Sequence, residues 1–171
     1  MKQVSFRNDV LPLKNIIYRL ALRITLNKEE AEDIVQDTLI KVWNKREQWD
    51  EIESIEAYSL TIARNISLDR VRRKAHQPEL LDDSETGVHA SSTTNPYESI
   101  YRHNQMRIVE QLMETLPEKQ RLCFQLRDFE GKSYKEIAQV MDISEDQVKV
   151  NIFRARQAVK TKYEQIDQYG L

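Results

Sequence analysis

The 171-residue sequence has little of what covalent or metal-based chemistry requires. It contains one cysteine, three histidines, three glycines and four prolines. A single cysteine excludes an intrachain disulfide, and the apolar neighbours of Cys123 indicate a core residue rather than a redox group. The histidines have no neighbouring cysteine, and no glycine-rich phosphate loop is present. We therefore expect no metal site, no cofactor and no enzymatic activity.

Long apolar runs are also absent. No stretch approaches the roughly 20 consecutive apolar residues that cross a bilayer. The first residues, MKQVSFRNDVLPLK, lack the apolar core of a signal peptide. We therefore expect a cytoplasmic protein that does not insert directly into a membrane. The scarcity of glycine and proline, together with 32% charged residues, predicts long helices and an all-α fold.

One segment without helical periodicity divides the chain. Residues 76–100 are rich in Ser, Thr, Asp and Pro, and they carry five acidic residues but no Lys or Arg. This composition predicts a flexible acidic linker between two small helical domains, residues 1–75 and 101–171. The net charge of -2 argues against DNA binding driven by charge alone, so a DNA-binding function would need strategically placed cations or a larger partner.

The C-terminal domain is predicted to contain four helices. The first begins near Tyr97 and ends before Pro117. The second starts with Pro117 in its first turn and continues to about Phe129, with Gly131 as its stop. The last two are short amphipathic helices between residues 132 and 160.

The last two helices form the pattern of a helix-turn-helix. Ser133 with Glu136, and Ser144 with Gln147, fit the capping box that marks a helix start. Apolar residues then recur at helical spacing on one face of each helix. These residues are Tyr134, Ile137, Ala138 and Met141 in the first helix, and Val148, Ile152, Ala155 and Val159 in the second.

The opposite face of the second helix is unusual for a solvent-exposed surface. It carries Val150, Phe153, Arg154 and Gln157, with Lys149 and Lys160 at its sides. Valine and phenylalanine amid polar residues suggest that a partner covers this face. In a DNA major groove, apolar side chains contact thymine methyl groups and Arg reaches guanine edges. Packing against an adjacent domain is the alternative.

In the N-terminal domain, the helix NKEEAEDIVQDTLIKVWNK begins after Asn27. Its predicted apolar face consists of Ala31, Ile34, Val35, Leu39, Val42 and Trp43. The other face carries Asp33, Gln36 and Asp37 around Ile40, which is typical of a surface that binds a basic and partly apolar protein. A solvated acidic face with one exposed isoleucine explains the pattern equally well.

A second long helix is predicted from about Ile55 to Lys74. Four cations near its end, Arg70, Arg72, Arg73 and Lys74, complement the negative end of the helix and also suit a nucleic-acid backbone. The loop before this helix contains Trp49, which we assign to the core.

These segments, in this order, closely resemble bacterial RNA polymerase sigma factors of the extracytoplasmic-function (ECF) group, in the sigma-70 superfamily. The resemblance is carried by AEDIVQDTLIKVW, IARNISLDRVRRK, LPEKQRLCFQLRDFEGKSYKEIAQVMDIS and VKVNIFRARQAVK. It implies a transcription initiation factor whose N-terminal domain binds core RNA polymerase and recognises the −10 promoter element. The C-terminal helix-turn-helix would recognise the −35 element.

The resemblance also implies roles for individual residues. Asp33, Gln36, Asp37 and Ile40 would meet the clamp helices of the largest polymerase subunit. Residues 44–53 with Arg64, Asn65, Arg70, Arg72 and Arg73 would face the −10 DNA. Lys149, Val150, Phe153 and Arg154, with Gln157, would face the −35 DNA. Relatives often carry Ser or Arg at the positions of Val150 and Asn151, so the promoter consensus is not implied. An anti-sigma factor is the further partner that we expect.

Two alternatives remain open from the sequence. A dimeric helix-turn-helix regulator would bind its operator without polymerase. A helical adaptor that binds only proteins would not depend on Arg154.

Overall fold

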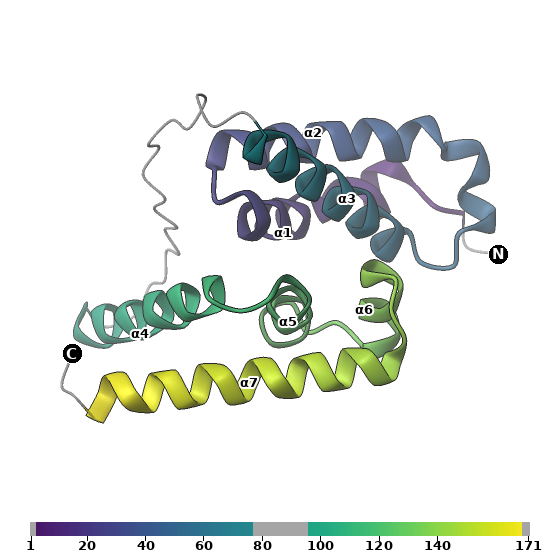
Figure 1. The fold of residues 1–171 in the computed structure, drawn as a ribbon. Coiled ribbons are helices and arrows are strands. Elements are labelled where there is room, and N and C mark those ends of the chain that lie inside the picture. Colours follow the sequence, from purple (N-terminus) through teal and green to yellow (C-terminus); the bar gives the residue numbers. More distant parts are fainter. Residues whose placement is uncertain (1–2, 77–95, 169–171) are drawn as a thin grey trace. The chain divides into compact units, whose positions relative to one another are not determined.

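The computed structural model describes residues 3–76 and 96–168, with the backbone alone for residues 96–103 and 168. All regular structure in these residues is helical (Figure 1), which confirms the all-α prediction. Residues 77–95, most of the predicted linker, lie outside the described part. Packing divides the described residues into two compact units, residues 3–76 with 135–142 and residues 96–134 with 143–168. Among the described helices, none is both long enough and apolar enough to cross a membrane.

The first unit is built on three packed α-helices. They are α1 (Lys14–Thr25), α2 (Lys28–Asn44) and α3 (Ile55–Ala75), with the short turns η1 (Phe6–Val10), η2 (Leu11–Leu13) and η3 (Arg46–Glu51). The sequence arguments did not include α1, although its buried residues Ile16, Ile17, Leu20, Ala21 and Ile24 have helical spacing. Since α1 packs against both α2 and α3, it supports the two helices that carry the predicted sites.

Small residues allow α3 to approach its neighbours closely. Ala57, Ala63, Ser59 and Ser67 are all buried in α3. The hydroxyl of Ser59 donates to the carbonyl of Ile55 at 2.7 Å, and Ser67 donates to Ala63 in the same way. These two buried hydroxyls are thus satisfied within their own helix, and they need no partner across the interface.

The predicted start of α2 is confirmed. The Asn27 side chain accepts a hydrogen bond from the backbone N–H of Glu30 at 3.0 Å. Ser54 caps α3 in the same way, accepting from Ala57 at 3.1 Å. Side-chain caps of this kind satisfy backbone donors that a helix start leaves unpaired.

The helices of the second half differ from prediction at Pro117 and in the length of α7, which is not short and continues eight residues beyond Lys160. They are α4 (Pro96–Glu114), α5 (Glu118–Phe124), the π-turn η5 (Gln125–Phe129), α6 (Tyr134–Met141) and α7 (Glu145–Gln168). Pro117 is the N-cap of α5, with an extended ψ of 147°, and lies just before the first turn. The predicted helix to Phe129 continues as η5 and ends before Gly131, whose φ of +66° suits glycine.

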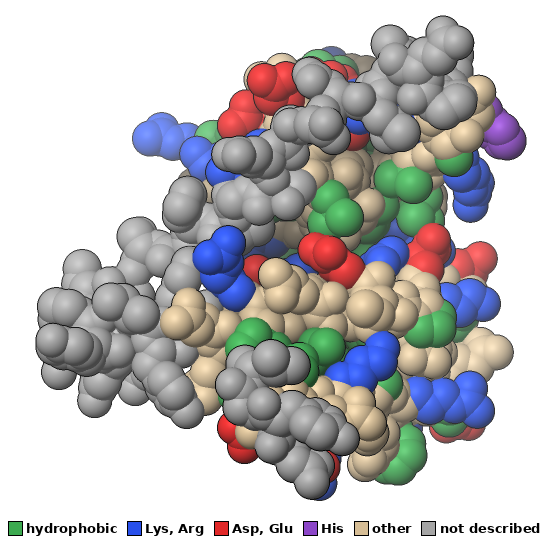
Figure 2. All heavy atoms as spheres, turned by 60° about the vertical axis from the view of Figure 1, so that its left-hand side comes forward, with side chains coloured by type: hydrophobic (Ala, Val, Ile, Leu, Met, Phe, Trp, Pro, Cys, Tyr) green, Lys and Arg blue, Asp and Glu red, His purple; other side chains and the backbone are tan. Residues whose placement is uncertain are grey.

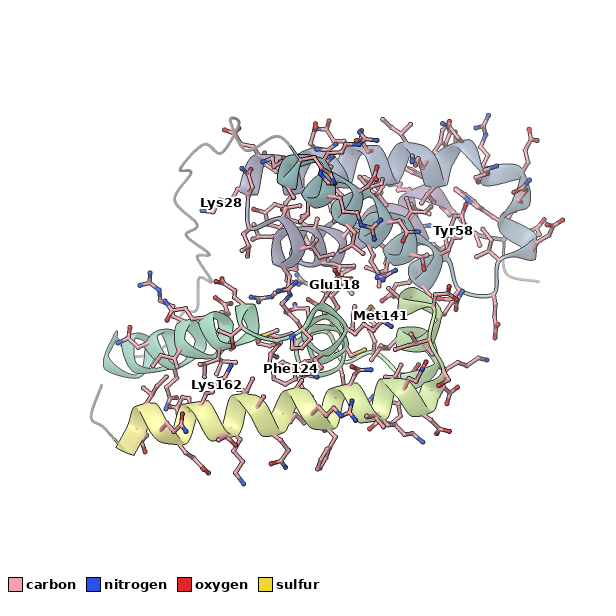
Figure 3. All side chains as sticks on the ribbon, viewed as in Figure 1. Lys28, Tyr58, Glu118, Phe124, Met141 and Lys162 are labelled. Carbon is pink, nitrogen blue, oxygen red and sulfur yellow. The ribbon has the colours of Figure 1, made fainter. Side chains whose placement is uncertain are left out.

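The core of the second unit lies between α4, α5 and α7. It contains Leu112, Met113, Leu116, Phe124, Ala155 and Val159. Phe124 lies between α5 and α7 (Figure 3) and makes an edge-to-face contact with Phe129 at 5.9 Å. Lys162 of α7 donates to the Thr115 hydroxyl at the end of α4. Cys123 is buried, which confirms its assignment to the core.

Candidate nucleic-acid and protein interfaces

Two opposite faces of α7 have the predicted character. Val148, Ile152, Ala155 and Val159 are all buried, as expected for the core-facing stripe. Phe153 on the other face is 64% exposed, and Val150 is exposed beside it. The side chain of Arg154 is exposed too, and within the described residues it has no ion pair or hydrogen bond. The structure therefore holds α7 by one face and leaves the candidate reading face open.

The N-terminus of α7 is fixed by the predicted capping box. The backbone N–H of Gln147 donates to the Ser144 hydroxyl at 3.2 Å, and the Ser144 N–H donates to the Gln147 side chain at 3.1 Å. Asp142, with φ of 54°, turns the chain between α6 and α7. Aspartate tolerates this left-handed conformation better than most residues. These features define where the outward face of α7 begins.

Lys149 lies beside the ring of Tyr134, a residue that the sequence predicted only as part of the apolar face of α6. Its Nζ is 5.6 Å from the ring centre of Tyr134, and the Arg127 guanidinium is 4.5 Å from the same ring. Arg127 also donates to the carbonyl of Lys132 at 2.8 Å. The structure thus adds Arg127 and Tyr134 to the surroundings of Lys149. Arg127 and Lys149 are 22 residues apart in the sequence, so local sequence patterns did not predict this cluster.

Arg156 is a cation of α7 with an internal partner. Its Nε donates to Asp128 at 2.9 Å, and a second, shorter hydrogen bond joins the same two side chains. Hydrogen bonding to Asp128 raises the pKa of the Arg156 guanidinium. Arg154 and Arg156 therefore differ: Arg156 braces α7 against η5, and Arg154 extends from the open face.

The predicted protein-binding face of α2 is exposed. Ile40 is 57% exposed, and Asp33 and Gln36 are exposed beside it. Asp37 is partly exposed, one turn from Asp33. A bulky apolar side chain surrounded by acids and an amide is thus accessible to a partner.

Arg70 of α3 is held by this acidic face. Its guanidinium is 3.2 Å from Asp33 and 2.7 Å from Asp37. Lys74, one turn later, pairs with Glu30 at 2.7 Å. Sequence reasoning assigned Asp33 and Asp37 to one site and Arg70 to another, and the structure brings them together.

Other predicted DNA-facing residues surround a hollow on α3. Arg64, Asn65 and Arg72 line a hollow of about 470 Å³. Its remaining lining residues are Ile62, Ile66, Leu68 and Asp69 from α3 and Lys41 from α2. Lys41 was missed because it lies on a different helix. Arg73 does not line the hollow and pairs instead with Asp69 at 3.0 Å.

The two tryptophans near the end of α2 behave differently. Trp49 is buried and donates through its indole N–H to the carbonyl of Val42 at 3.0 Å, as the core assignment predicted. Trp43 was predicted to be in the apolar face, but it is 44% exposed. Phe6 from the N-terminal turn packs edge-on against Trp43, and Arg46 lies 4.5 Å above its ring. Trp43 therefore covers the edge of the core.

Basic and acidic side chains lie close together on the described surface. Figure 2 shows Lys and Arg side chains in blue close to Asp and Glu side chains in red. The ion pairs of Arg70, Arg73 and Lys74 show the same mixing at the end of α3. Weak, mixed charge does not favour indiscriminate binding to DNA.

Two helical units, with α6 and α7 joined by a tight turn and the outward face of α7 exposed, have the architecture expected of a helix-turn-helix protein. The family model of sigma-70 region 2 matches residues 10–77. That of sigma-70 region 4 matches residues 106–159, which include α5, α6 and most of α7.

Relatives extend the similarity over most of the chain. The ECF RNA polymerase sigma factor SigM of Bacillus subtilis is 30% identical over 152 residues, 87% of this chain and 89% of SigM. The RNA polymerase sigma-H factor of Pseudomonas aeruginosa is 31% identical over 157 residues, 88% of this chain and 81% of that protein. The chain therefore belongs to the ECF RNA polymerase sigma factors.

Solved structures share the fold. The sigma factor RpoE of Bartonella quintana, in a complex with the anti-sigma factor NepR, aligns with a TM-score of 0.75 at 21% identity. The alignment covers 93% of this chain and 96% of RpoE. CnrH, in a complex with the cytosolic domain of CnrY, aligns with a TM-score of 0.67 at 22% identity and covers 94% of this chain and 88% of CnrH.

Proposed function

We propose that this chain directs core RNA polymerase to specific promoters, as a non-enzymatic initiation factor. ECF sigma factors bind core polymerase and promoter DNA, and the chain belongs to this family. Polymerase supplies the affinity that a protein with a net charge of -2 lacks. As a polymerase subunit it would act in the cytoplasm, where the chromosome lies.

The observation that carries the proposal is the open face of α7. A helix fixed by a buried stripe presents Val150, Phe153, Arg154 and Gln157 to the outside. An apolar pair next to an arginine that has no ion pair among the described residues suits the major groove, where thymine methyl groups and guanine acceptors are both available. We assign these residues and Lys149 to recognition of the −35 element.

The first unit would carry two further contacts. We assign Asp33, Gln36, Asp37 and the exposed Ile40 to the clamp helices of the largest polymerase subunit. The hollow that contains Arg64, Asn65 and Arg72 is our candidate for the −10 DNA. Its cations suit phosphates, and its apolar lining residues suit the face of an unpaired base.

An anti-sigma factor is a further proposed partner. Both solved relatives were captured with a protein partner, RpoE with NepR and CnrH with the cytosolic domain of CnrY. A protein that covers the face of α2 or of α7 would block the corresponding contact of this chain.

Promoter-specific transcription with purified core polymerase tests the proposed function. Adding the chain should start transcripts at defined promoters that core polymerase alone does not use. A regulator of the dimeric type would bind its operator without polymerase, and a protein-only adaptor would leave initiation unchanged when Arg154 is replaced. Promoter-specific initiation that does not depend on the chain would disprove the proposal.

Asp33→Ala with Gln36→Ala tests the polymerase face. We expect about tenfold weaker binding to core polymerase, because two polar groups beside the exposed Ile40 are lost. Titration of labelled protein with core polymerase measures the affinity. Glu47→Ala is the control, since it removes an exposed acid that lies in η3, outside α2. Equal affinities for the two variants would contradict the assignment.

A further inference from the structure

The Arg70 side chain connects two helices with different proposed partners. One nitrogen of its guanidinium is 3.2 Å from Asp33 and another is 2.7 Å from Asp37. The two aspartates are four residues apart on α2, so their carboxylates lie on neighbouring turns of one face. A single planar guanidinium thus bridges both carboxylates.

The bridge belongs to a regular arrangement of ion pairs. Lys74, one turn after Arg70, pairs with Glu30, one turn before Asp33. The residue later in α3, Lys74, pairs with the residue earlier in α2, Glu30, as expected for two antiparallel helices. Only 23% of the Arg70 side chain is exposed, so the packed helices restrict its conformations. Arg73 shows the contrast, because it is 77% exposed and pairs within its own helix.

Stability alone gives little reason for this bridge. Exposed ion pairs contribute about 0 to 1 kcal/mol. The bridge also affects the geometry of the two acids, because carboxylates one turn apart repel each other unless a cation lies between them. Asp33 and Asp37 remain 64% and 47% exposed. Each can therefore accept further hydrogen bonds on its outer side while Arg70 holds the inner side.

We propose that Arg70 is a positioning residue for polymerase binding and not a DNA contact. It fixes Asp33 and Asp37 as one pre-arranged acceptor pair for a basic partner surface, which lowers the ordering cost of binding. This role rests on the proposed function, since it assumes that α2 faces polymerase. It also separates Arg70 from Arg64 and Arg72, which line the hollow on α3.

Arg70→Ala and Arg70→Lys test the proposal in titrations with core polymerase. Arg70→Ala should weaken binding on the order of 3- to 10-fold. Arg70→Lys should also weaken it, because an ammonium does not reproduce the fork that spans two carboxylates. A phosphate contact, in contrast, would tolerate lysine. Arg73→Ala is the matched control: it removes the same charge from the same helix without touching α2, and its affinity should be unchanged.

A double-mutant cycle makes the test specific. If Arg70 acts through Asp37, Arg70→Ala should cost little further affinity in an Asp37→Asn background. Circular dichroism and thermal unfolding of each variant identify any loss of fold, and Arg70→Lys retains both the charge and most of the packing.

The other possible binding results distinguish the Arg70 proposal from the proposed polymerase face. If Arg70→Lys binds polymerase like the unmodified chain, or if Arg70→Ala binds more tightly, Arg70 is not a positioning residue. If Asp33→Ala with Gln36→Ala weakens binding but neither Arg70 variant does, the polymerase face stands and the Arg70 proposal fails. If none of these variants weakens binding, both proposals fail.

Discussion

The charged face of α2 and the outward face of α7 each expose a large apolar side chain among polar groups, but their charges are arranged differently. On α2, Asp33 and Asp37 already share the Arg70 guanidinium. On α7, Phe153 is accompanied by Arg154, which has no internal partner in the described chain. The negative charge of the α2 face is thus partly neutralised within the protein itself, whereas the positive charge of Arg154 on the α7 face is not.

This difference suits two kinds of partner. A duplex offers closely spaced phosphates and base edges, so an unpaired arginine on a rigid helix can bind it directly. A protein surface demands precise complementarity, and carboxylates held in place by a neighbouring helix provide it.

The largest expected effect compares two phenylalanines of the second unit. Phe124→Ala should lower the free energy of unfolding by about 3 to 5 kcal/mol, because it removes a buried ring between α5 and α7. Phe153→Ala, at the exposed face, should change it by less than about 0.5 kcal/mol. Urea unfolding followed by circular dichroism measures both. A large loss of unfolding free energy in Phe153→Ala would mean that the outward face of α7 is part of the core. The comparison of this face with the exposed face of α2 would then fail.

An intermediate effect is expected at Arg154. Arg154→Ala should cost about 1 to 3 kcal/mol at one base pair of the promoter and relax the preference there. Binding of the holoenzyme to a promoter set varied throughout the −35 element measures it. Arg156→Ala is the matched control, since Arg156 is bound to Asp128 and should not alter base preference. Uniform loss across all promoters would make Arg154 a phosphate contact.

The smallest effects are expected at the starts of the two helices. Asn27→Ala and Ser144→Ala should each lower the free energy of unfolding by about 1 kcal/mol, because a backbone donor loses its cap. Ser144→Asp keeps an acceptor and should restore most of the stability. Thermal unfolding detects the difference. A Ser144→Ala variant that is as stable as Ser144→Asp would show that packing alone defines the start of α7.

Helical periodicity predicted the α7 stripe well. Each of its four residues is buried, and Val150 and Phe153 are exposed. The same reasoning failed for Trp43, because helical spacing does not show how far the core extends at the end of a helix. It also omitted α1, although that helix has a regular buried stripe.

The local sequence pattern determined most of the helices, the caps at Asn27 and Ser144, and the two helix faces that expose apolar side chains among polar ones. It could do so because backbone capping and apolar spacing act over a few residues. Only the tertiary structure decided which charges are already satisfied. Arg70 is 33 residues from Asp37, and Arg127 is 22 residues from Lys149. Helix packing brings such groups together, and that packing is set by the whole core, which no short motif encodes.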